Sequence, residues 1–333
     1  MKLLVCGSEG TILSATIPLL LAAGHDVTGV DSCKKWGEIP KRRDYKLFVG
    51  DCADPVALRP LMRGVDGVIQ GVATLFGVVG YHERAAEILT NDIAAHQTTV
   101  RLAAEFGVER VVFLSSSVVY EQSRHEPHRE EEVEFAGIPR TDYGISKLVN
   151  ERISQAYSRQ RNLPFTIWRP FNVINPEEEA EESPGYSHVF ADLLHRLVER
   201  RQNPLEILGD GRQVRSFLHV REAAEAIAKF SFDARTKNEI FNLGRDEPIT
   251  MRSLASRLYR KTVDRGMTPD AGPLAFRSIP VVETDVKRRV GSFEKIAREL
   301  NWQSSISLDE SLDDCLDALE TRRHGAPLLA RSV

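Results

Sequence analysis

The first half of the chain alternates short, wholly apolar segments with longer amphipathic ones, and this alternation restricts the possible folds more than any other feature. The apolar segments are Leu3–Cys6, Val27–Val30, Leu47–Val49, Gly67–Ile69, Val111–Leu114 and Leu163–Trp168. Strands without a period-two polar pattern are buried on both faces, as in a parallel sheet that helices cover. The sequence therefore predicts an α/β fold with a doubly wound, Rossmann-type parallel sheet.

The second half of the chain shows a different sequence pattern, with charged runs and fewer apolar strand segments. A charged run over residues 177–182, followed by Ser183-Pro184-Gly185, predicts a loop. Further helices are expected at Val189–Arg200, Glu222–Phe232, Met251–Tyr259, Ser292–Leu300 and Leu308–Glu320. We expect a sheet domain of residues 1–170 plus about 214–245, a smaller α+β lobe of residues 171–213 and 246–320, and a mobile tail at 321–333. In an open α/β sheet, ligands bind in the crevice at the strand C-termini, beside such a lobe.

Composition excludes several classes of protein. The 333 residues carry 44 Lys+Arg and 48 Asp+Glu, a balance without the basic excess that nucleic acid or acidic lipid would attract. No apolar run approaches the ~20 residues of a spanning helix, and Met1-Lys2 leads directly into the first apolar segment. The four cysteines have no paired spacing. We expect a cytoplasmic protein with free thiols, no metal site and no signal peptide.

The segment Gly7-Ser8-Glu9-Gly10 lies directly between the first strand and the first helix. Glycines there allow the backbone to turn tightly and to approach a pyrophosphate at the helix N-terminus. Asp31 ends the second strand about 20 residues later, where a carboxylate accepts the adenosine ribose hydroxyls. A carboxylate at this point favours NAD over NADP. Asp51, at the end of the third strand, is placed to meet the adenine.

Two residues of the glycine turn depart from the usual GxxGxxG pattern. Leu13 replaces the third glycine, and we expect it to hold the first helix further from the sheet. Glu9 is expected to place a negative charge near the pyrophosphate. Either change can weaken cofactor binding, but the site survives both if the helix shifts slightly.

Tyr143 and Lys147 stand four residues apart on a predicted helix that Thr141-Asp142 begin, so they share one face. A free phenol has a pKa near ~10, and a neighbouring lysine cation stabilises the phenolate and lets it act as a base nearer neutral pH. The run Ser115-Ser116-Ser117 follows a central strand, where a hydroxyl can bond the substrate oxygen that the tyrosine deprotonates.

Five stretches together resemble a known family. They are Ser115–Tyr120, Tyr143–Lys147, Arg169–Val173, Gly209–Phe217 and Leu300-Asn301-Trp302. On these motifs the chain is similar, from the glycine turn to about Leu316, to the extended short-chain dehydrogenases/reductases of the NAD-dependent epimerase/dehydratase family, the group that contains UDP-galactose 4-epimerase. The resemblance implies that the sheet domain binds NAD and that the lobe binds a nucleoside-diphosphate sugar.

The resemblance also implies roles for single residues. Tyr143 would be the base and Lys147 its partner, and the catalytic hydroxyl, four residues before Tyr120, would be Ser116. The residues expected to hold NAD are Gly7, Gly10, Thr11, Ile12, Asp31, Asp51, Cys52, Val72, Asn91, Tyr143, Lys147 and Phe171. Those expected to hold the substrate are Ser117, Asn172, His188, Val189, Arg215 and Arg289, with Arg288 as the alternative to Arg289. Guanidinium groups suit a diphosphate because their paired donors match phosphate oxygens.

The family branches after a shared first step, in which a 4-keto sugar forms. Its dehydratases carry an Asp-Glu pair after the catalytic hydroxyl and its decarboxylases a Glu, whereas this chain has Ser117 and Val118 there. C4 epimerisation is therefore favoured. The alternatives are a lyase that uses Glu83 or Glu121, a dehydrogenase that releases its cofactor, and a nucleotide-sensing protein without chemistry.

Two further expectations follow from the resemblance and from the acidic run. The helices at about His82–Phe106 and Tyr143–Ser158 match those that form the dimer interface in the family, which implies a homodimer. If the acidic run over residues 177–182 borders the sugar, its negative charges repel a uronic acid and disfavour that substrate. The alternative interpretation, a loop that contacts only solvent, is equally compatible with the sequence.

Overall fold

The computed structural model describes residues 1–34, 44–74, 83–180, 187–280 and 286–323. Its centre is a seven-stranded parallel sheet in the order β11-β6-β5-β4-β1-β2-β3. The strands are β1 (Lys2–Cys6), β2 (Asp26–Asp31), β3 (Lys46–Val49), β4 (Gly67–Gln70), β5 (Arg110–Leu114), β6 (Phe165–Pro170) and β11 (Glu239–Leu243). The order reverses between β1 and β4, which confirms the predicted doubly wound Rossmann-type sheet.

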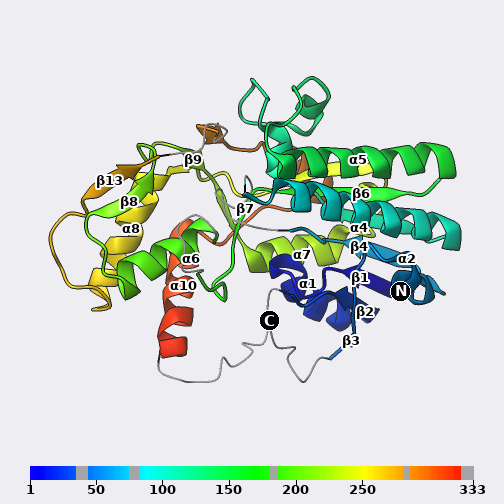
Figure 1. Cartoon of the computed structure of the whole chain (residues 1–333), viewed down its shortest axis with the longest axis horizontal. Helices are drawn as coiled ribbons and strands as arrows, with labels where there is room; N and C mark the ends of the chain where they lie inside the picture. The colour runs from blue at the N-terminus through cyan, green and yellow to red at the C-terminus, as the bar shows by residue number, and fades with distance from the viewer. Residues whose placement is uncertain (35–43, 75–82, 181–186, 281–285, 324–333) are drawn as a thin grey trace.

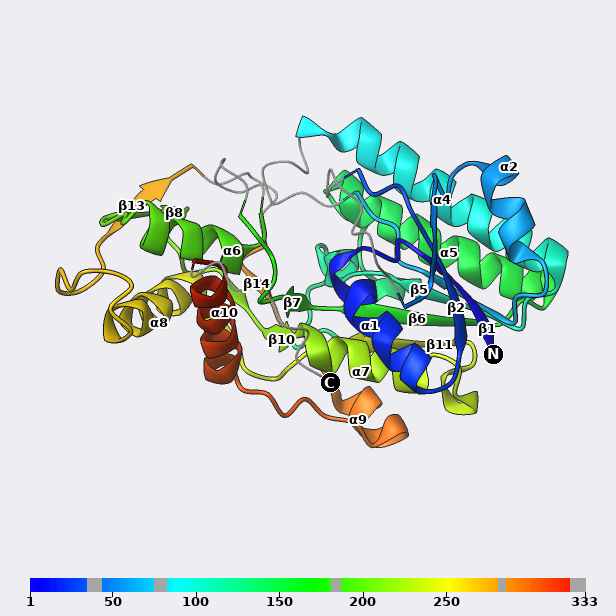
Figure 2. The ribbon, with the colours of Figure 1, turned by 90° about the horizontal axis from the view of Figure 1, so that it is seen from below.

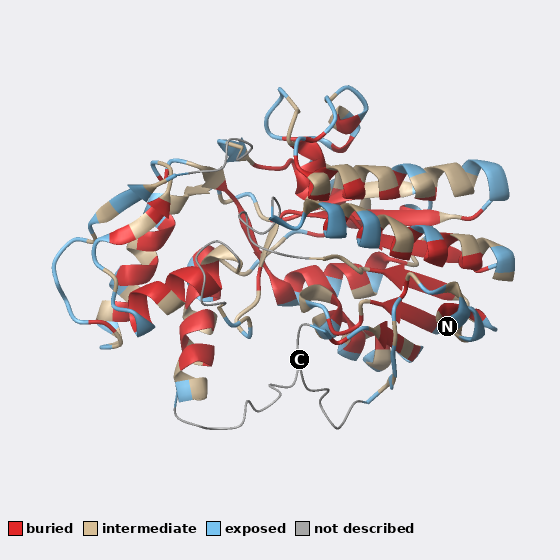
Figure 3. Cartoon of the chain, in the orientation of Figure 1, coloured by how far each residue is buried: buried red, intermediate tan, exposed pale blue. Residues whose placement is uncertain are grey.

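Helices cover both faces of this sheet (Figures 1 and 2). The helices α1 (Thr11–Ala22) and α7 (Val220–Phe230) pack together on one face, and α4 (Ala85–Phe106) and α5 (Asp142–Arg161) on the other, with the short α2 (Pro55–Leu58) beside α4. Strands β1, β4, β5 and β6 are almost wholly buried (Figure 3). Two covered faces explain why their sequences show no polar alternation.

A smaller lobe lies beyond the C-terminal ends of the strands (Figure 1). It contains α6 (Val189–Leu194), a π-helical turn (His195–Glu199), α8 (Met251–Asp264) and α10 (Leu308–Arg323), together with β8 (Leu205–Leu208) and β13 (Phe276–Ile279). These elements share a separate apolar core that includes Leu197, Leu254, Leu258 and Leu312. Short strands join the two parts: β7 (Asn172–Ile174) pairs with β10 (Phe217–His219), and β9 (Val214–Arg215) pairs with β12 (Ile249–Thr250) and β14 (Arg288–Arg289).

The structure corrects the expected boundaries in three places. Helix α9 (Glu294–Leu300) packs on β11, and its Ile296 and Leu300 belong to the core of the sheet domain rather than to the lobe. Strand β9, expected in the sheet domain, lies outside the central sheet. Helix α10 continues to Arg323, three residues into the expected tail, because its last residues bond elsewhere in the lobe, as Arg322 Nη1 does with the Pro176 carbonyl at 3.3 Å. Residues 324–333 lie outside the described part.

All four cysteines are free and buried in the structure. In the described ranges no helix is both long and apolar enough to cross a membrane.

Candidate active site

A cavity of about 840 Å³ opens at the C-terminal edge of the sheet, between the sheet domain and the lobe. Its walls come from the β1–α1 turn, the ends of β2, β4, β5 and β6, helices α4 and α5, and the lobe. All the residues predicted for catalysis, cofactor and substrate line it. The candidate residues, far apart in sequence, therefore meet at one site.

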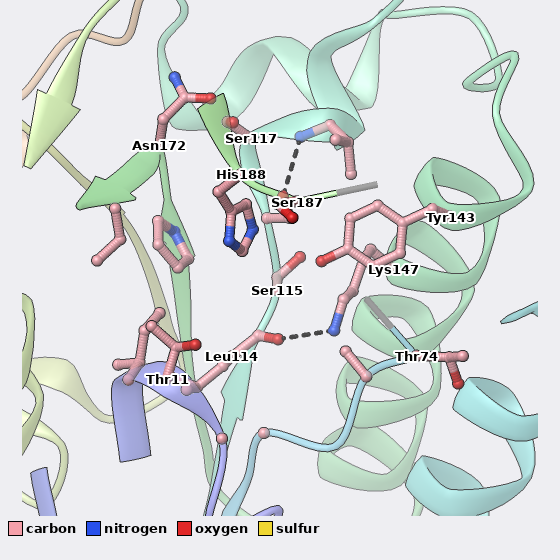
Figure 4. Close-up of a pocket in the computed structure, with 18 of the residues that line it drawn as sticks. Thr11, Thr74, Leu114, Ser115, Ser117, Tyr143, Lys147, Asn172, Ser187 and His188 are labelled. Carbon is pink, nitrogen blue, oxygen red and sulfur yellow. Dashed lines mark hydrogen bonds between the residues drawn. The ribbon is translucent and has the colours of Figure 1, made fainter. Parts of the chain in front are cut away.

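Helix α5 presents Tyr143 and Lys147 to this cavity. The helix begins where predicted, because the Thr141 side chain caps it by accepting from the Gly144 N–H at 3.0 Å. Tyr143 is 6% and Lys147 1% exposed. The Lys147 ammonium donates to the Leu114 carbonyl at 3.2 Å and lies 5.5 Å from the centre of the Tyr143 ring (Figure 4). The phenol and the cation are therefore held together at the end of β5.

Two buried carboxylates surround the Lys147 ammonium. Burial lowers the pKa of Lys147, and the negative charges of Asp92 and Glu151 act in the opposite direction. Asp92 is itself buried, which raises its pKa, although Lys147 opposes that shift. One Asp92 oxygen accepts from the Thr74 N–H at 2.8 Å, and the other has no hydrogen-bond partner among the described residues. The lysine charge is thus balanced by acids outside the cavity wall.

The three serines after β5 have different surroundings. The Ser115 hydroxyl donates to Glu151 at 2.5 Å and is buried. Ser116 is only partly buried, and its hydroxyl accepts weakly from the Val118 N–H, at 3.4 Å. The Ser116 hydroxyl therefore keeps its own donor for a ligand, which is what the predicted role requires. Ser117 is buried and also lines the cavity.

The β1–α1 turn has the shape that a dinucleotide requires. Gly7 has φ +79°, and a Cβ there would lie 2.9 Å from the Val72 nitrogen. Gly10 begins α1 without a capping side chain, and no acidic residue occupies the first turn. The N–H groups of that turn therefore face the cavity beside Thr11 and Ile12 with the positive end of the helix. These residues fit a pyrophosphate.

Glu9 does not approach this position. It is 7% exposed and does not line the cavity, and its carboxylate accepts a hydrogen bond from the Tyr45 hydroxyl. Its own N–H donates to Asp31 at 3.0 Å. The expectation that Glu9 places its charge beside the pyrophosphate is therefore wrong, because the carboxylate is turned toward Tyr45. Asp31 also accepts from the Cys33 N–H at 2.8 Å and retains acceptor capacity for ribose hydroxyls.

The remaining cofactor candidates surround the same half of the cavity. Asp51 is exposed and accepts from the Ala53 N–H at 2.8 Å, while the adjacent Cys52 is buried, with a pKa that a hydrogen bond with Cys6 raises. The Val72 N–H donates to Gln70 at 2.9 Å. Phe171 is buried and meets Phe293 edge-on, with ring centres 5.4 Å apart.

On helix α4, the predicted cofactor residue Asn91 is followed by a more deeply buried residue, Asp92. Asn91 is exposed and lines the cavity rim, whereas Asp92 is buried behind the wall. Sequence reasoning missed Asp92. The signal was available in the helix phase, because Ile88, Ala95 and Thr99 define the buried stripe and Asp92 falls on it.

Two arginines lie side by side in the cavity wall, on strands outside the central sheet. Arg215 in β9 and Arg289 in β14 are directly opposite in a parallel register. The Arg289 Nε is buried without a hydrogen-bond partner among the described residues, and Arg215 donates to the Val214 carbonyl at 2.8 Å. Arg288, the alternative, points elsewhere and pairs with Glu126 at 2.6 Å. The Arg215–Arg289 pair fits a diphosphate.

Among the other substrate candidates, Asn172 lies across the pocket from Tyr143, and His188 lies between them (Figure 4). The Asn172 amide donates to the Ser216 carbonyl at 2.9 Å, which ties β7 to the β9–β10 segment. His188 contacts Glu178 at 2.8 Å, and Val189 begins α6 directly after it. In the described ranges no cluster of three potential ligands could hold a metal ion.

A buried charge network, which sequence reasoning also missed, lies behind the serines. Arg169 donates to both oxygens of Glu151, at 2.9 and 2.7 Å, and also to the Tyr120 hydroxyl at 2.7 Å. Burial alone would lower the pKa of Arg169, but Glu151 raises it. Because Glu151 also binds Ser115, this network fixes the strand end that carries Ser116. The resemblance indicated Arg169 only as part of a motif.

Comparison with known proteins identifies relatives. Residues 3–244 match the family described as "NAD dependent epimerase/dehydratase family". Among solved structures, UDP-glucose 4-epimerase from Thermotoga maritima with UDP-glucose is 22% identical, covers 97% of this chain and 100% of its own, and has a TM-score of 0.82. The dTDP-glucose 4,6-dehydratase of Streptomyces venezuelae with NAD is 23% identical, with 98% and 99% coverage and a TM-score of 0.83. UDP-glucose 4-epimerase of Thermus thermophilus with NAD is 23% identical, with 96% and 99% coverage and a TM-score of 0.80.

Proposed function

The chain belongs to the NAD-dependent epimerase/dehydratase family, and we propose that it interconverts C4 epimers of a nucleoside-diphosphate sugar. The observation that carries the proposal is the convergence of Ser116, Tyr143 and Lys147 with the Arg215–Arg289 pair in one cavity. NAD, as in the rest of the family, supplies the hydride acceptor and donor when bound. Solved structures of similar fold that contain UDP-glucose, or NAD with a dTDP-sugar enzyme, support this substrate class.

Each residue has a distinct part in this proposal. Tyr143 takes the proton of the sugar 4-hydroxyl, and the Lys147 charge stabilises the phenolate that receives it. Ser116 donates to the same sugar oxygen and orients it. Arg215 and Arg289 hold the diphosphate, so that binding energy far from the reacting carbon fixes the sugar in position.

The carboxylates near the cavity support epimerisation over elimination. Glu121 accepts from the N–H groups of Arg140 and Thr141, at 2.8 and 2.9 Å, and from the Thr141 hydroxyl at 2.5 Å. These three bonds engage both oxygens of the Glu121 carboxylate with the Arg140–Thr141 segment, so neither oxygen is left without a partner within the protein. Glu83 does not line the described cavity, and Glu87, which does, is 3.5 Å from Arg84. Val118 occupies the position next to Ser117 without any titratable group.

The domain roles follow from this proposal. We assign NAD to the sheet domain and the nucleoside diphosphate to the lobe, with the corrected boundaries given above. We also propose a homodimer through α4 and α5, which lie side by side along one face of the sheet domain (Figure 1). Light scattering during size-exclusion chromatography tests the dimer, and a monomer at micromolar concentration would contradict it.

The experiment that tests the reaction is proton NMR of the protein with NAD and a panel of UDP-, dTDP-, GDP- and CDP-hexoses. We expect one hexose to give its C4 epimer. A 4-keto-6-deoxy product would assign a dehydratase, loss of carbon dioxide from a uronic acid a decarboxylase, and stoichiometric NADH release a dehydrogenase. Binding without turnover of any sugar would assign a sensor.

Tyr143→Phe is the matching variant. We expect kcat to fall by about 10²–10⁴-fold, because general base catalysis typically contributes this much, while nucleotide-sugar binding persists. Tyr157→Phe, on the same helix but outside the cavity, is the control and should retain activity. Equal activity of the two variants would remove Tyr143 from the mechanism.

A further inference from the structure

Leu13, the residue that breaks the glycine pattern, occupies space that another glycine leaves open. Leu13 lies in the first turn of α1 and is 2% exposed. Gly71 follows β4 directly and donates its N–H to the Cys6 carbonyl at 2.9 Å. A Cβ on Gly71 would lie 2.5 Å from Leu13 Cδ1 and 3.2 Å from Leu114 Cδ1. In the conformation that it adopts, the Leu13 side chain therefore occupies space that a side chain at residue 71 would need.

This contact corrects the expectation that Leu13 holds the helix further from the sheet. A third glycine normally lets α1 approach the sheet closely. Here the residue without a side chain, Gly71, directly follows strand β4, and the large residue, Leu13, is on helix α1. The helix can therefore still approach the sheet closely, although the small and the large residue have exchanged places. The turn is tight on its other side as well, because a Cβ on Gly7 would lie 3.0 Å from the Gly71 carbonyl carbon.

We propose that Leu13 and Gly71 form a size-exchanged pair that positions the first turn of α1 for NAD. Both residues line the cavity, so Leu13 supplies apolar wall that a side chain at position 71 would otherwise supply. The N–H groups of the same helical turn face the pyrophosphate, so a shift of Leu13 moves them. The proposal rests on the assignment of this turn to the cofactor.

Gly71→Ala is the variant that tests the pair. Adding one methyl group to a filled site displaces the leucine, the helix turn or both. We expect the Kd for NAD, measured by calorimetry on protein freed of nucleotide, to rise about tenfold, and the melting temperature without NAD to fall. The double variant Leu13→Ala with Gly71→Ala removes the obstruction, and its Kd should return to within about threefold of the original.

Gly67→Ala is the matched control, because Gly67 lies at the other end of the same strand. A Cβ there would overlap the Phe232 ring, far from the cavity. We expect this variant to lower the melting temperature with no change in the Kd for NAD. The difference between the two alanine variants separates a positioning role from a merely structural one.

An unchanged Kd in Gly71→Ala, or a double variant whose losses simply add, would overturn the pair while leaving the proposed function intact. Failure of the original protein to bind NAD at all would overturn both. If Gly71→Ala does not fold but the double variant folds and binds NAD, that rescue is itself the expected result.

Discussion

The sheet domain and the lobe both use ion pairs, but they place them in opposite environments. Beneath the serines, the side chains of Glu151 and Arg169 are each 2% exposed and joined by two hydrogen bonds. In the lobe, α8 and α10 are joined by a ladder of half-exposed pairs. It comprises Arg257–Asp309, Lys261–Asp309, Lys261–Asp313, Arg265–Asp313, Arg265–Asp317 and Arg265–Glu320. Water and salt screen the ladder and cannot reach the buried pair.

The difference separates a contact that cannot be replaced from contacts that can. A buried bidentate pair has one geometry, and removing either partner leaves an uncompensated charge. In the ladder Lys261 and Arg265 each have more than one carboxylate of α10 within reach, so the loss of one contact leaves others. The first kind of contact fixes the strand end that carries Ser116, and the second kind joins two helices of the lobe at their half-exposed edge.

The largest expected effect is from Glu151→Gln, which removes the buried charge with little change of shape. Arg169 then stays buried without its anion, and Ser115 loses a charged acceptor. We expect the free energy of unfolding, from urea titration, to fall by about 3–5 kcal/mol, and the loss to be the same in 0.1 and 1 M NaCl. A loss below about 1 kcal/mol would remove the contrast between the two regions.

The next effect concerns two histidines that are buried in the neutral form, one inside the sheet domain and one where that domain meets α10 of the lobe. Burial lowers the pKa of His96, on α4, to about 3 and that of His219, at the start of α7, to about 4, both from 6.5. Below pH 6.5 the unfolded chain takes up protons that the folded chain does not. Stability therefore falls as the pH drops, by about 1.4 kcal/mol per pH unit for each histidine, until the folded pKa is reached.

His96→Gln and His219→Gln measure these contributions separately. Between pH 6 and 4.5, each variant should show a smaller slope of the unfolding free energy against pH. The reduction should correspond to about one proton fewer taken up on unfolding. The His219 contribution should end near pH 4, because Asp314, 3.3 Å from its ring, partly offsets the burial. A variant with the original slope would show that its histidine is protonated in the folded protein.

The smallest effect is expected from Asp313→Asn, in the middle of the ladder. Asp313 contacts Lys261 at 2.8 Å and Arg265 at 3.0 Å, and both cations keep other carboxylates when it is neutral. We expect a loss of about 0.2–1 kcal/mol in 0.1 M NaCl and none in 1 M NaCl. The salt dependence is the useful measurement, since Glu151→Gln should show none. If the loss in unfolding free energy were independent of salt in both variants, the ion pairs between α8 and α10 would not be screened by the solvent.

Sequence reasoning reached the sheet, its covering helices and the meeting of the predicted site residues. These depend on local patterns: wholly apolar strands, the Thr141 cap and the four-residue spacing of Tyr143 and Lys147. It failed where the answer lay in a contact between distant residues. Leu13 was misread because Gly71 is 58 positions away, and Glu9 because Tyr45 is 36 away. No spacing rule connects such pairs.

The helix α9 shows the same limit at the level of domains. Its position late in the chain suggested the lobe, but its apolar side chains fit the core under β11. Asp92 marks a different limit, because the family motif points to the asparagine next to it, and only the phase of the buried helix face points to Asp92.

The chain passes between the two parts repeatedly: it leaves the sheet after β6, returns with β10, α7 and β11, leaves at β12, returns with α9 and ends in α10. No single cut of the polypeptide therefore releases the lobe as one piece. In evolution or in the laboratory, this lobe cannot be exchanged for another by joining two genes at one point. New substrate preferences must enter as replacements within several separate segments, each constrained by the strands that carry it across.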